Sequence, residues 1–160
     1  MLCDSKRGFH ELKLGEKKNL AVVFAEEYKV ALYGNAFDLV QCQNEVDFTS
    51  MDDIRRNLES ITVYEVKSTN KENLPEDFSG YFFDLTTSEL LVAQSLGSHF
   101  KFAFVNTING HCRETDIHGL LSSARKIYPK WAVTLGSLSS ETLILKKDKG
   151  TNSRIKSKPK

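Results

Sequence analysis

The sequence predicts an α/β fold, a mixed sheet flanked by helices. Three observations lead to this prediction. Apolar residues recur at helical spacing near the start of the chain. Ile61–Lys67 has the composition of a strand. A capped helix and another apolar run then follow it. With 160 residues, 40% of them hydrophobic, the chain is long enough to bury a core of its own.

The N-terminal elements are a helix and a hairpin. A helix is predicted for Lys13–Glu27, whose apolar residues follow the i, i+3, i+4 spacing of one helix face. Tyr28–Tyr33 and Phe37–Cys42 are expected to be two strands that pair around the turn residues Gly34-Asn35. These elements place a short antiparallel ladder directly after the first helix.

The middle of the chain adds the central strand. Asn44–Ser60 is polar and is interpreted as an insertion with a short helix at Met51–Leu58. Ile61–Lys67 is the clearest strand of the sequence. Residues 70–80 form a loop, marked by a proline and a glycine, and Tyr81–Leu85 is expected to be a further strand.

The remaining elements complete an α-β-β-β-α-β order with C-terminal additions. The capping box Thr86-Thr-Ser-Glu89 begins a helix that Gly97 ends. Phe100–Val105 is the next strand. A helix within residues 116–128 and a last strand at Trp131–Leu135 are expected after it.

Residues 1–145 are predicted to form one domain and residues 146–160 a basic tail. The tail has one acid, Asp148, and seven basic residues: Lys146, Lys147, Lys149, Arg154, Lys156, Lys158 and Lys160. Without the tail, acidic residues outnumber basic ones in the body of the protein. The tail, with Lys146, Lys147 and Lys149 nearest the domain, either binds nucleic acid by releasing counterions or is a disordered, solubilising end.

Composition narrows the class of protein. No apolar run approaches the roughly 20 residues that span a bilayer, and the first residues lack the apolar core of a secretory signal. The three cysteines are odd in number and form no C-x-x-C pair, which argues against disulfides, zinc and a cysteine nucleophile with a nearby base. We therefore expect an intracellular protein, cytoplasmic or nuclear, that does not associate with membranes.

Three charged residues are candidates for a catalytic, metal-binding site. Glu65 and Lys67 are two positions apart on one strand, so they share a face and lie about 7 Å apart. Apolar neighbours indicate that this face is partly buried, where charges are costly without a partner or a function. If the strands pair, Asp38 comes beside Glu65, and a divalent cation relieves the repulsion between two carboxylates.

Mg²⁺ suits such an oxygen-rich site, and Mn²⁺ is expected to substitute for it. Asp38 and Glu65 are the predicted ligands, with the backbone carbonyl of Val66 as a further candidate. A metal held there acidifies water and polarises a phosphoryl oxygen. Lys67 is predicted to orient or deprotonate the attacking water and to stabilise charge in the transition state.

The runs Phe37-Asp-Leu-Val40 and Tyr64-Glu-Val-Lys-Ser-Thr69 resemble the PD-(D/E)XK nuclease superfamily, which has the restriction-endonuclease-like fold. The predicted element order from Leu14 to Val105 is similar to the core of that family. The resemblance implies that Asp38 and Glu65 bind metal, that Lys67 is catalytic and that Glu16 assists. Asp47 is the alternative to Asp38 as the first acidic ligand.

This resemblance implies a metal-dependent endonuclease that hydrolyses phosphodiester bonds, in DNA rather than RNA, in a restriction-type or junction-resolvase-like role. Cutting two strands with so small a core suggests a homodimer. The alternative is an inactive module of the same fold that binds nucleic acid or a protein, which the acidic body favours.

Several residues allow two interpretations. Ser68 and Thr69 follow the lysine and either contact a phosphate or simply end the strand. Glu16 is either a metal ligand or a first-turn acid favoured by the helix dipole. Glu89 either orients Lys67 or serves only the capping box.

Overall fold

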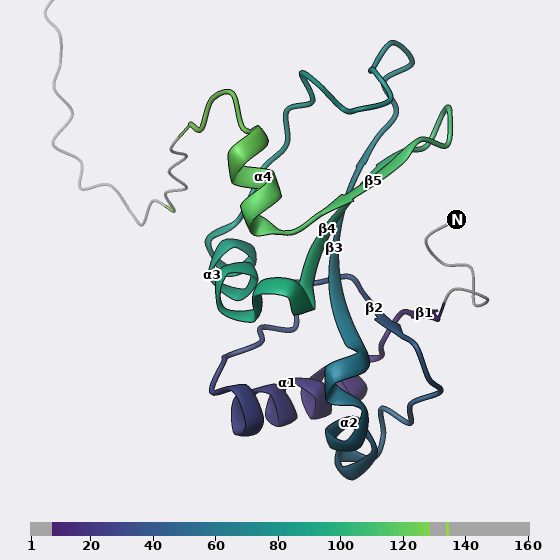
Figure 1. Ribbon diagram of the computed structural model, residues 1–160, viewed down its shortest axis with the longest axis vertical. Coiled ribbons are helices and arrows are strands. Elements are labelled where there is room, and N and C mark those ends of the chain that lie inside the picture. The colour runs from purple at the N-terminus through teal and green to yellow at the C-terminus, as the bar shows by residue number, and fades with distance from the viewer. Residues whose placement is uncertain (1–7, 129–133, 135–160) are drawn as a thin grey trace, which may run out of the picture. The chain divides into compact units, whose positions relative to one another are not determined.

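The computed structural model describes residues 8–128 and 134. The chain divides into two units, Met1–Lys126 and Ile127–Lys160, and the elements described below belong to the first (Figure 1). In chain order they are β1 (Phe9–His10), α1 (Leu14–Tyr28), β2 (Leu39–Cys42), α2 (Met51–Asn57), η2 (Leu58–Ser60), β3 (Ile61–Thr69), α3 (Thr87–Leu96), η3 (Gly97–His99), β4 (Phe100–Asn106), β5 (Cys112–Thr115) and α4 (Ile117–Ser123).

The strands form a five-stranded mixed sheet in the order β1-β2-β3-β4-β5. β3 and β4 are parallel and are connected through α3, whereas β1–β2, β2–β3 and β4–β5 are antiparallel pairs. Parallel neighbours need such a crossover because the chain must return to the edge of the sheet where the first strand began, and a tight turn cannot span that distance. The predicted α/β class, with a mixed sheet flanked by helices, is confirmed.

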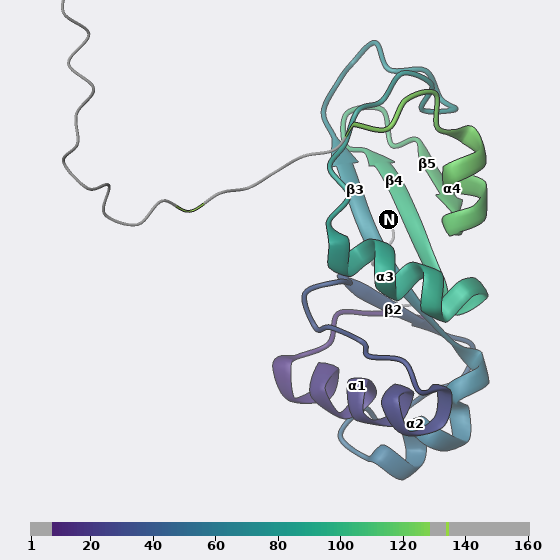
Figure 2. The ribbon, with the colours of Figure 1, turned by 90° about the vertical axis from the view of Figure 1, so that its left-hand side faces the viewer.

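The core lies between one face of the sheet and the helices. α1, α3 and α4 lie on the same side of the sheet in both ribbon views (Figures 1 and 2). The buried residues of this core include Leu20 and Phe24 of α1, Val92 of α3, and Val63 and Phe102 of the central strands. Because side chains alternate along a strand, the residues between them point to the opposite face. There a second, smaller cluster contains Phe9, Leu39, Tyr64 and Ala103.

The predicted Tyr28–Tyr33 strand and its hairpin are wrong. α1 continues through Tyr28 and ends at Lys29, whose left-handed φ of 59° stops the helix. The following residues form no strand, although Leu32 is buried and the Gly34-Asn35 turn is present. The antiparallel partners of β2 are instead β1 and β3, so the order of three consecutive strands after the first helix is not observed.

Other differences concern short elements. Tyr81–Leu85 is not a strand; alternate residues of it are half-buried, and the rings of Tyr81 and Phe83 pack on Phe104. β5 was not predicted, because its Cys-Arg-Glu-Thr sequence lacks an apolar pattern. The helix expected within residues 116–128 covers only Ile117–Ser123. The strand expected at Trp131–Leu135 and the tail from residue 146 lie outside the described residues.

The predictions for α1, α2, α3, β3 and β4 are confirmed, with the ends of these elements shifted by a few residues. Thr86 and Glu89 form the expected capping box of α3, and Gly97 ends the helix with a φ of 55°. Among helices of residues 8–128, not one has the length and apolarity needed to cross a membrane.

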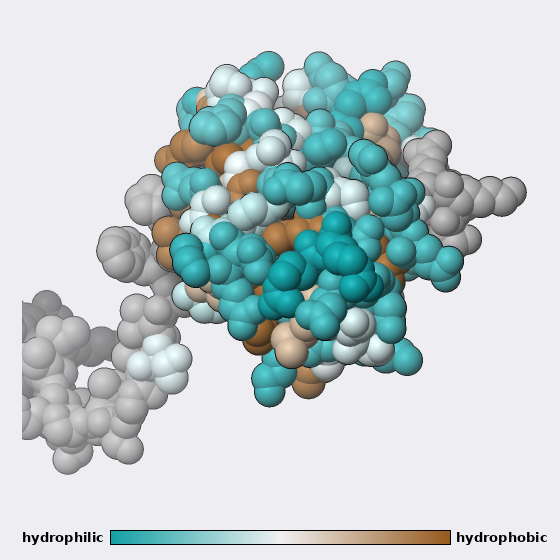
Figure 3. Space-filling view, turned by 60° about the horizontal axis from the view of Figure 1, so that its bottom comes forward, coloured by the Kyte–Doolittle hydropathy of each residue, from teal (hydrophilic) through white to brown (hydrophobic). Residues whose placement is uncertain are grey.

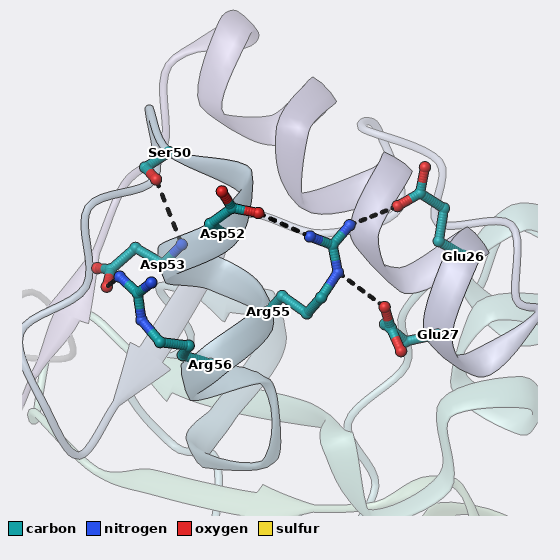
Figure 4. A network of polar contacts seen from close by, with 7 residues as sticks. All are labelled: Glu26, Glu27, Ser50, Asp52, Asp53, Arg55 and Arg56. Atoms are coloured by element: carbon teal, nitrogen blue, oxygen red, sulfur yellow. Dashed lines mark hydrogen bonds and ion pairs between the residues drawn. The ribbon is translucent and has the colours of Figure 1, made fainter.

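α1 and α2 are joined by a network of ion pairs around Arg55 (Figure 4). The guanidinium group of Arg55 contacts Glu26 at 2.6 Å and Glu27 at 2.8 Å on α1, and Asp52 at 2.9 Å on its own helix. The face of the molecule that carries α1 and α2 is mainly hydrophilic (Figure 3). These ion pairs are partly exposed and are therefore worth little individually, but they hold the insertion helix α2 against α1.

Candidate active site

β3 places Glu65 and Lys67 on the helix-covered face of the sheet. Side chains alternate between the two faces along a strand, so Glu65 and Lys67 share the face of Ile61 and Val63, whose side chains are fully buried. Glu65 is 7% exposed, and the side chain of Lys67 is 13% exposed. The ammonium group of Lys67 donates a hydrogen bond to Glu65 Oε1 at 2.8 Å. The predicted pair is thus a contact in the structure, in a poorly solvated position.

Asp38 lies directly before β2, opposite Glu65 of β3. The ladder pairs Leu39 with Tyr64, and the N–H of Asp38 donates to the carbonyl of Tyr64 at 2.8 Å. Asp38, which precedes Leu39, therefore comes beside Glu65, which follows Tyr64. Asp38 Oδ2 accepts the N–H of Val66 at 2.8 Å, and Asp38 is exposed. One acid of the pair thus faces solvent, and the other is buried.

The N-terminus of α3 brings a second carboxylate to Lys67. Glu89 Oε2 accepts a hydrogen bond from the N–H of Thr86 at 3.2 Å, which completes the capping box. The same oxygen accepts a hydrogen bond from the ammonium group of Lys67 at 2.8 Å. Glu89 is 5% exposed. Both interpretations of Glu89 from the sequence therefore apply at once: it caps α3 and binds Lys67. The ammonium group of Lys67 is held between two buried carboxylates that come from different elements.

Burial and charge set the protonation of these groups. Desolvation raises the pKa of Glu65 to about 7; the hydrogen bond from Lys67 opposes this rise, and the charge of Asp38 adds to it. Burial by itself lowers the pKa of Lys67, but its hydrogen bonds to Glu65 and Glu89 outweigh burial and leave it above the ordinary value. Lys67 is therefore a cation at neutral pH, whereas the carboxyl group of Glu65 changes from protonated to ionised near neutral pH.

The donor set fits a magnesium-type ion. The charge of Asp38 penalises ionisation of Glu65, and a divalent cation bound by these two acids would remove that penalty. In the described part of the chain, no group of three or more His, Cys, Asp or Glu side chains is placed to hold a metal. Mg²⁺ does not require one, since it binds through one or two carboxylates, waters and substrate phosphates.

The carbonyl of Val66 is suitably placed for such an ion. Carbonyl and N–H groups of alternate strand residues point to the same side of the strand. The carbonyl of Tyr64 and the N–H of Val66 both meet Asp38, so Val66 presents its backbone to the β2 side. Asp38, Glu65 and the Val66 carbonyl are the residues that would hold a divalent cation.

The other predicted residues are placed differently. Glu16 is half-buried, and its carboxylate accepts the N–H of Lys13 at 2.7 Å at the start of α1; its charge is not among those that act on Glu65. Asp47 forms a local turn with Thr49 before α2. Asp38, not Asp47, is thus the acid beside Glu65. A metal role for Glu16 stays a prediction.

Ser68 and Thr69 lie on opposite faces of β3, because they are consecutive strand residues. Thr69 shares the face of Lys67, and its carbonyl accepts the N–H of Thr107 at 2.9 Å. The carbonyl of Ser68 accepts the hydroxyl of Tyr81 at 2.8 Å. Phosphate contacts by these two residues stay a prediction, as do those of Lys146, Lys147 and Lys149, which lie outside the described residues.

Lys17 is a site residue that sequence reasoning missed. Its ammonium group donates to the carbonyls of Phe37 at 2.8 Å and Gly34 at 3.2 Å, and it lies 4.5 Å from the centroid of the Phe37 ring. Lys17 thus ties the turn that leads directly into Asp38 to the first turn of α1. Its only sequence signal is a lysine on the half-buried side of the helix, which many solvated helices share.

Comparison of the chain with models of known protein families, with curated proteins and with solved structures gives no match.

Proposed function

We propose that this chain is a divalent-metal-dependent endonuclease that hydrolyses phosphodiester bonds in DNA. The observation that carries the proposal is the placement of Lys67. A buried ammonium group, held by Glu65 and Glu89, lies beside a pair of acids that belong to neighbouring strands. Burying such a cation and two carboxylates is costly, and a function in binding and cleaving a phosphodiester explains why they are kept.

Each residue has a role in the proposed reaction. Asp38, Glu65 and the carbonyl of Val66 hold the ion, and Mg²⁺ or Mn²⁺ at such a site supplies polarisation of a phosphoryl oxygen and acidification of water. Lys67 orients the attacking water and stabilises negative charge as it grows on the phosphoryl oxygens. Glu89 fixes the ammonium group in place, and the Glu65 carboxylate, ionised above pH 7, is ready to bind the cation.

The proposed substrate and assembly follow from the site. A single centre cuts one strand at a time, so a homodimer is the proposed form for a restriction-type or junction-resolvase-like role on both strands. The acidic body repels a polyanion, and the bound cation together with the basic tail from Lys146 offsets this repulsion. An intracellular location, cytoplasmic or nuclear, is part of the proposal.

A second candidate is an inactive module of the same fold that binds nucleic acid or a protein partner. The excess of acidic over basic residues before residue 146 favours it, because such a surface slows the approach of DNA. Cysteine chemistry has no comparable support. Burial raises the pKa of Cys42 to about 11, which leaves its thiol protonated and unreactive at neutral pH.

The experiment that tests the proposal is incubation of plasmid, single-stranded and branched DNA with the full chain and Mn²⁺. Lys67→Ala removes the proposed catalytic cation. Lys101→Ala is the matched control, because it removes the same charge from the other face of the neighbouring strand. Cleavage by the wild type and Lys101→Ala but not by Lys67→Ala supports the nuclease. No cleavage of any DNA by the wild type, or equal cleavage by both variants, refutes it.

A further inference from the structure

The edge of β3 extends past the end of its ladder with β2. β2 begins at Leu39, which pairs with Tyr64, so the rest of β3 has no described strand beside it on this edge. Backbone groups of alternate strand residues point to the same side. The carbonyl of Tyr64 and the N–H of Val66 both meet Asp38, so the N–H and the carbonyl of Ser68 face this edge as well. Ser68 is exposed, and its backbone lies where the ladder has ended.

Two side chains bind the backbone of β3 along this edge. Asp38 Oδ2 accepts the N–H of Val66 at 2.8 Å, and the hydroxyl of Tyr81 donates to the carbonyl of Ser68 at 2.8 Å. The carbonyl of Val66 and the N–H of Ser68 lie between these contacts, and none of the described residues forms a hydrogen bond with either. A backbone group of this kind is bound by water or by a ligand.

The N–H of Ser68 suits a phosphate oxygen better than another strand. A strand needs a run of N–H and carbonyl groups to form a ladder, but Asp38 and Tyr81 take the groups on either side. Backbone N–H groups commonly contact phosphate oxygens, and a hydrogen bond to an anion is stronger than one to a neutral group. The N–H belongs to the peptide between Lys67 and Ser68, so an anion there lies beside the strand position of the proposed catalytic cation.

Tyr81 lies across β3 and is held there by other rings. It stacks on Phe83, with ring centroids 5.8 Å apart, and packs edge-on against Phe104 at 6.1 Å. Phe104 is the partner of Lys67 on β4, so Tyr81 extends from the β4 side of Lys67 to the opposite edge of β3, where its hydroxyl meets Ser68. Because the rings hold Tyr81 separately from its hydrogen bond, the hydroxyl can be removed without moving the ring.

We propose that the free edge of β3 at Ser68 is a phosphate contact of the candidate site. The backbone N–H of Ser68 donates to a nonbridging oxygen of the phosphodiester, and Tyr81 is the positioning residue that holds the backbone of Ser68 for it. The inference rests on the proposed function for the identity of the anion. The side chain of Ser68 points to the face opposite Lys67 and takes no part, and the contact carries no base specificity.

The first test is binding of a fluorescent single-stranded oligonucleotide by the full chain, with Ca²⁺ in place of Mg²⁺ so that the probe is not consumed. Ser68→Pro removes the N–H, a change that the free edge of a strand tolerates. Ser68→Ala alters the side chain but keeps the N–H, so the difference between the two variants isolates the backbone contact. We expect Ser68→Pro to bind about tenfold more weakly than Ser68→Ala. Urea unfolding establishes that both variants are folded.

Tyr81→Phe tests the same contact without a change in the strand. It keeps the ring but releases the carbonyl of Ser68, and we expect it to weaken binding about two- to fivefold. Tyr28→Phe is the matched control, because it removes a phenol hydroxyl that donates to Glu59 Oε1 at 2.9 Å, away from the site. If Ser68→Pro is not folded, this pair decides the question, and equal binding by Tyr81→Phe and Tyr28→Phe overturns the proposal.

Phosphorothioate probes separate a direct contact from a structural effect. Sulfur is a weaker acceptor than oxygen, so replacing one nonbridging oxygen at a time should cost the wild type affinity with one diastereomer at one position. Ser68→Pro should lose this particular discrimination. Absence of oligonucleotide binding by the wild type, equal binding by folded Ser68→Pro and Ser68→Ala, or the same diastereomer preference in Ser68→Pro and wild type overturns the contact.

Two further measurements distinguish the alternatives. Sedimentation of Ser68→Pro and wild type tests whether another chain pairs with this edge: loss of self-association with unchanged oligonucleotide binding overturns the phosphate contact in favour of strand pairing. Cleavage of DNA by the wild type is measured separately with Mn²⁺. If cleavage is absent but Ser68→Pro weakens binding, the nuclease proposal fails and the contact stands; cleavage with unaffected binding gives the reverse result.

Discussion

The ammonium group of Lys67 lies 2.8 Å from Glu89 Oε2, and the same oxygen accepts the N–H of Thr86 that begins α3. One carboxylate thus serves helix formation and the candidate active site. Because glutamine also completes a capping box, the two roles can be separated by mutation.

Glu89→Gln should keep the fold but impair catalysis. The amide oxygen can still accept both hydrogen bonds, whereas the negative charge that holds Lys67 is lost, so we expect cleavage to fall about 10- to 100-fold. Thr86→Ala is the control: it removes the other half of the box, costs about 1 kcal/mol of unfolding free energy and leaves the Lys67–Glu89 pair in place. Urea unfolding and cleavage rates check both variants. A larger loss of activity in Thr86→Ala would contradict this division of roles.

Lys67→Met should destabilise the protein in a pH-dependent way. Without the ammonium group, Glu65 and Glu89 are buried acids with no cation between them. In the wild type the pKa of Glu65 is raised to about 7 although the hydrogen bond and the charge of Lys67 lower it, so loss of Lys67 raises this pKa further. The folded variant then keeps a proton that the unfolded chain releases, so its stability is greatest in acid and falls, relative to the wild type, as the pH rises. We expect a loss of about 3 kcal/mol at pH 8 and a smaller loss at pH 5.

Urea unfolding of wild type, Lys67→Met and Lys101→Met at the two pH values tests this expectation. Lys101→Met should show a small effect, since Lys101 is partly exposed on the other face. A destabilisation by Lys67→Met that is equal at pH 5 and pH 8 would show that Glu65 does not titrate in this range.

Metal affinity should rise with pH. A cation competes with the proton on Glu65, whose pKa is about 7, so Mn²⁺ should bind roughly tenfold more tightly at pH 8 than at pH 6. Calorimetry measures this directly. Glu65→Gln should abolish the heat of binding at both pH values, and Asp47→Asn, away from the site, should leave it unchanged. An affinity that does not depend on pH, or that survives Glu65→Gln, argues against the assigned ligands.

Lys17→Met should leave Asp38 less firmly positioned beside Glu65. The substitution removes hydrogen bonds to the carbonyls of Phe37 and Gly34 and the contact with the Phe37 ring, at a cost of about 1–2 kcal/mol of unfolding free energy. Because the turn before Asp38 is then held less firmly, cleavage and Mn²⁺ affinity should also fall. Lys18→Met, at an exposed position of the same helix, is the control. If the two variants behave alike, Lys17 has no positioning role.

The sequence predicted the parts of the candidate site that depend on local periodicity. Glu65 and Lys67 share a face because strand side chains alternate, whatever the neighbouring strands do. Asp38 was also placed beside Glu65, although the hairpin expected before it is wrong. That placement needed only the pairing of β2 with β3, not a strand at Tyr28–Tyr33.

What the sequence missed depends on contacts between distant segments. The capping box of Glu89 is visible within four residues, but its contact with Lys67 requires the packing of α3 against β3. Lys17 reaches a turn 20 residues away. β1 has two residues and no pattern of its own, and exists because β2 offers it an edge. Local propensity does not contain this information.

The hydrogen bond from the N–H of Val66 to Asp38 Oδ2 has a consequence for the sheet as well as for the site. At this point a side chain, rather than another strand, satisfies the backbone of β3. β2 begins only at the next residue, Leu39, so its ladder with β3 does not extend to Val66. A β2 that began earlier would take this N–H with its own backbone. The acid that would bind the metal thus also stands in for a strand residue, and one carboxylate would be shared between the sheet and the ion.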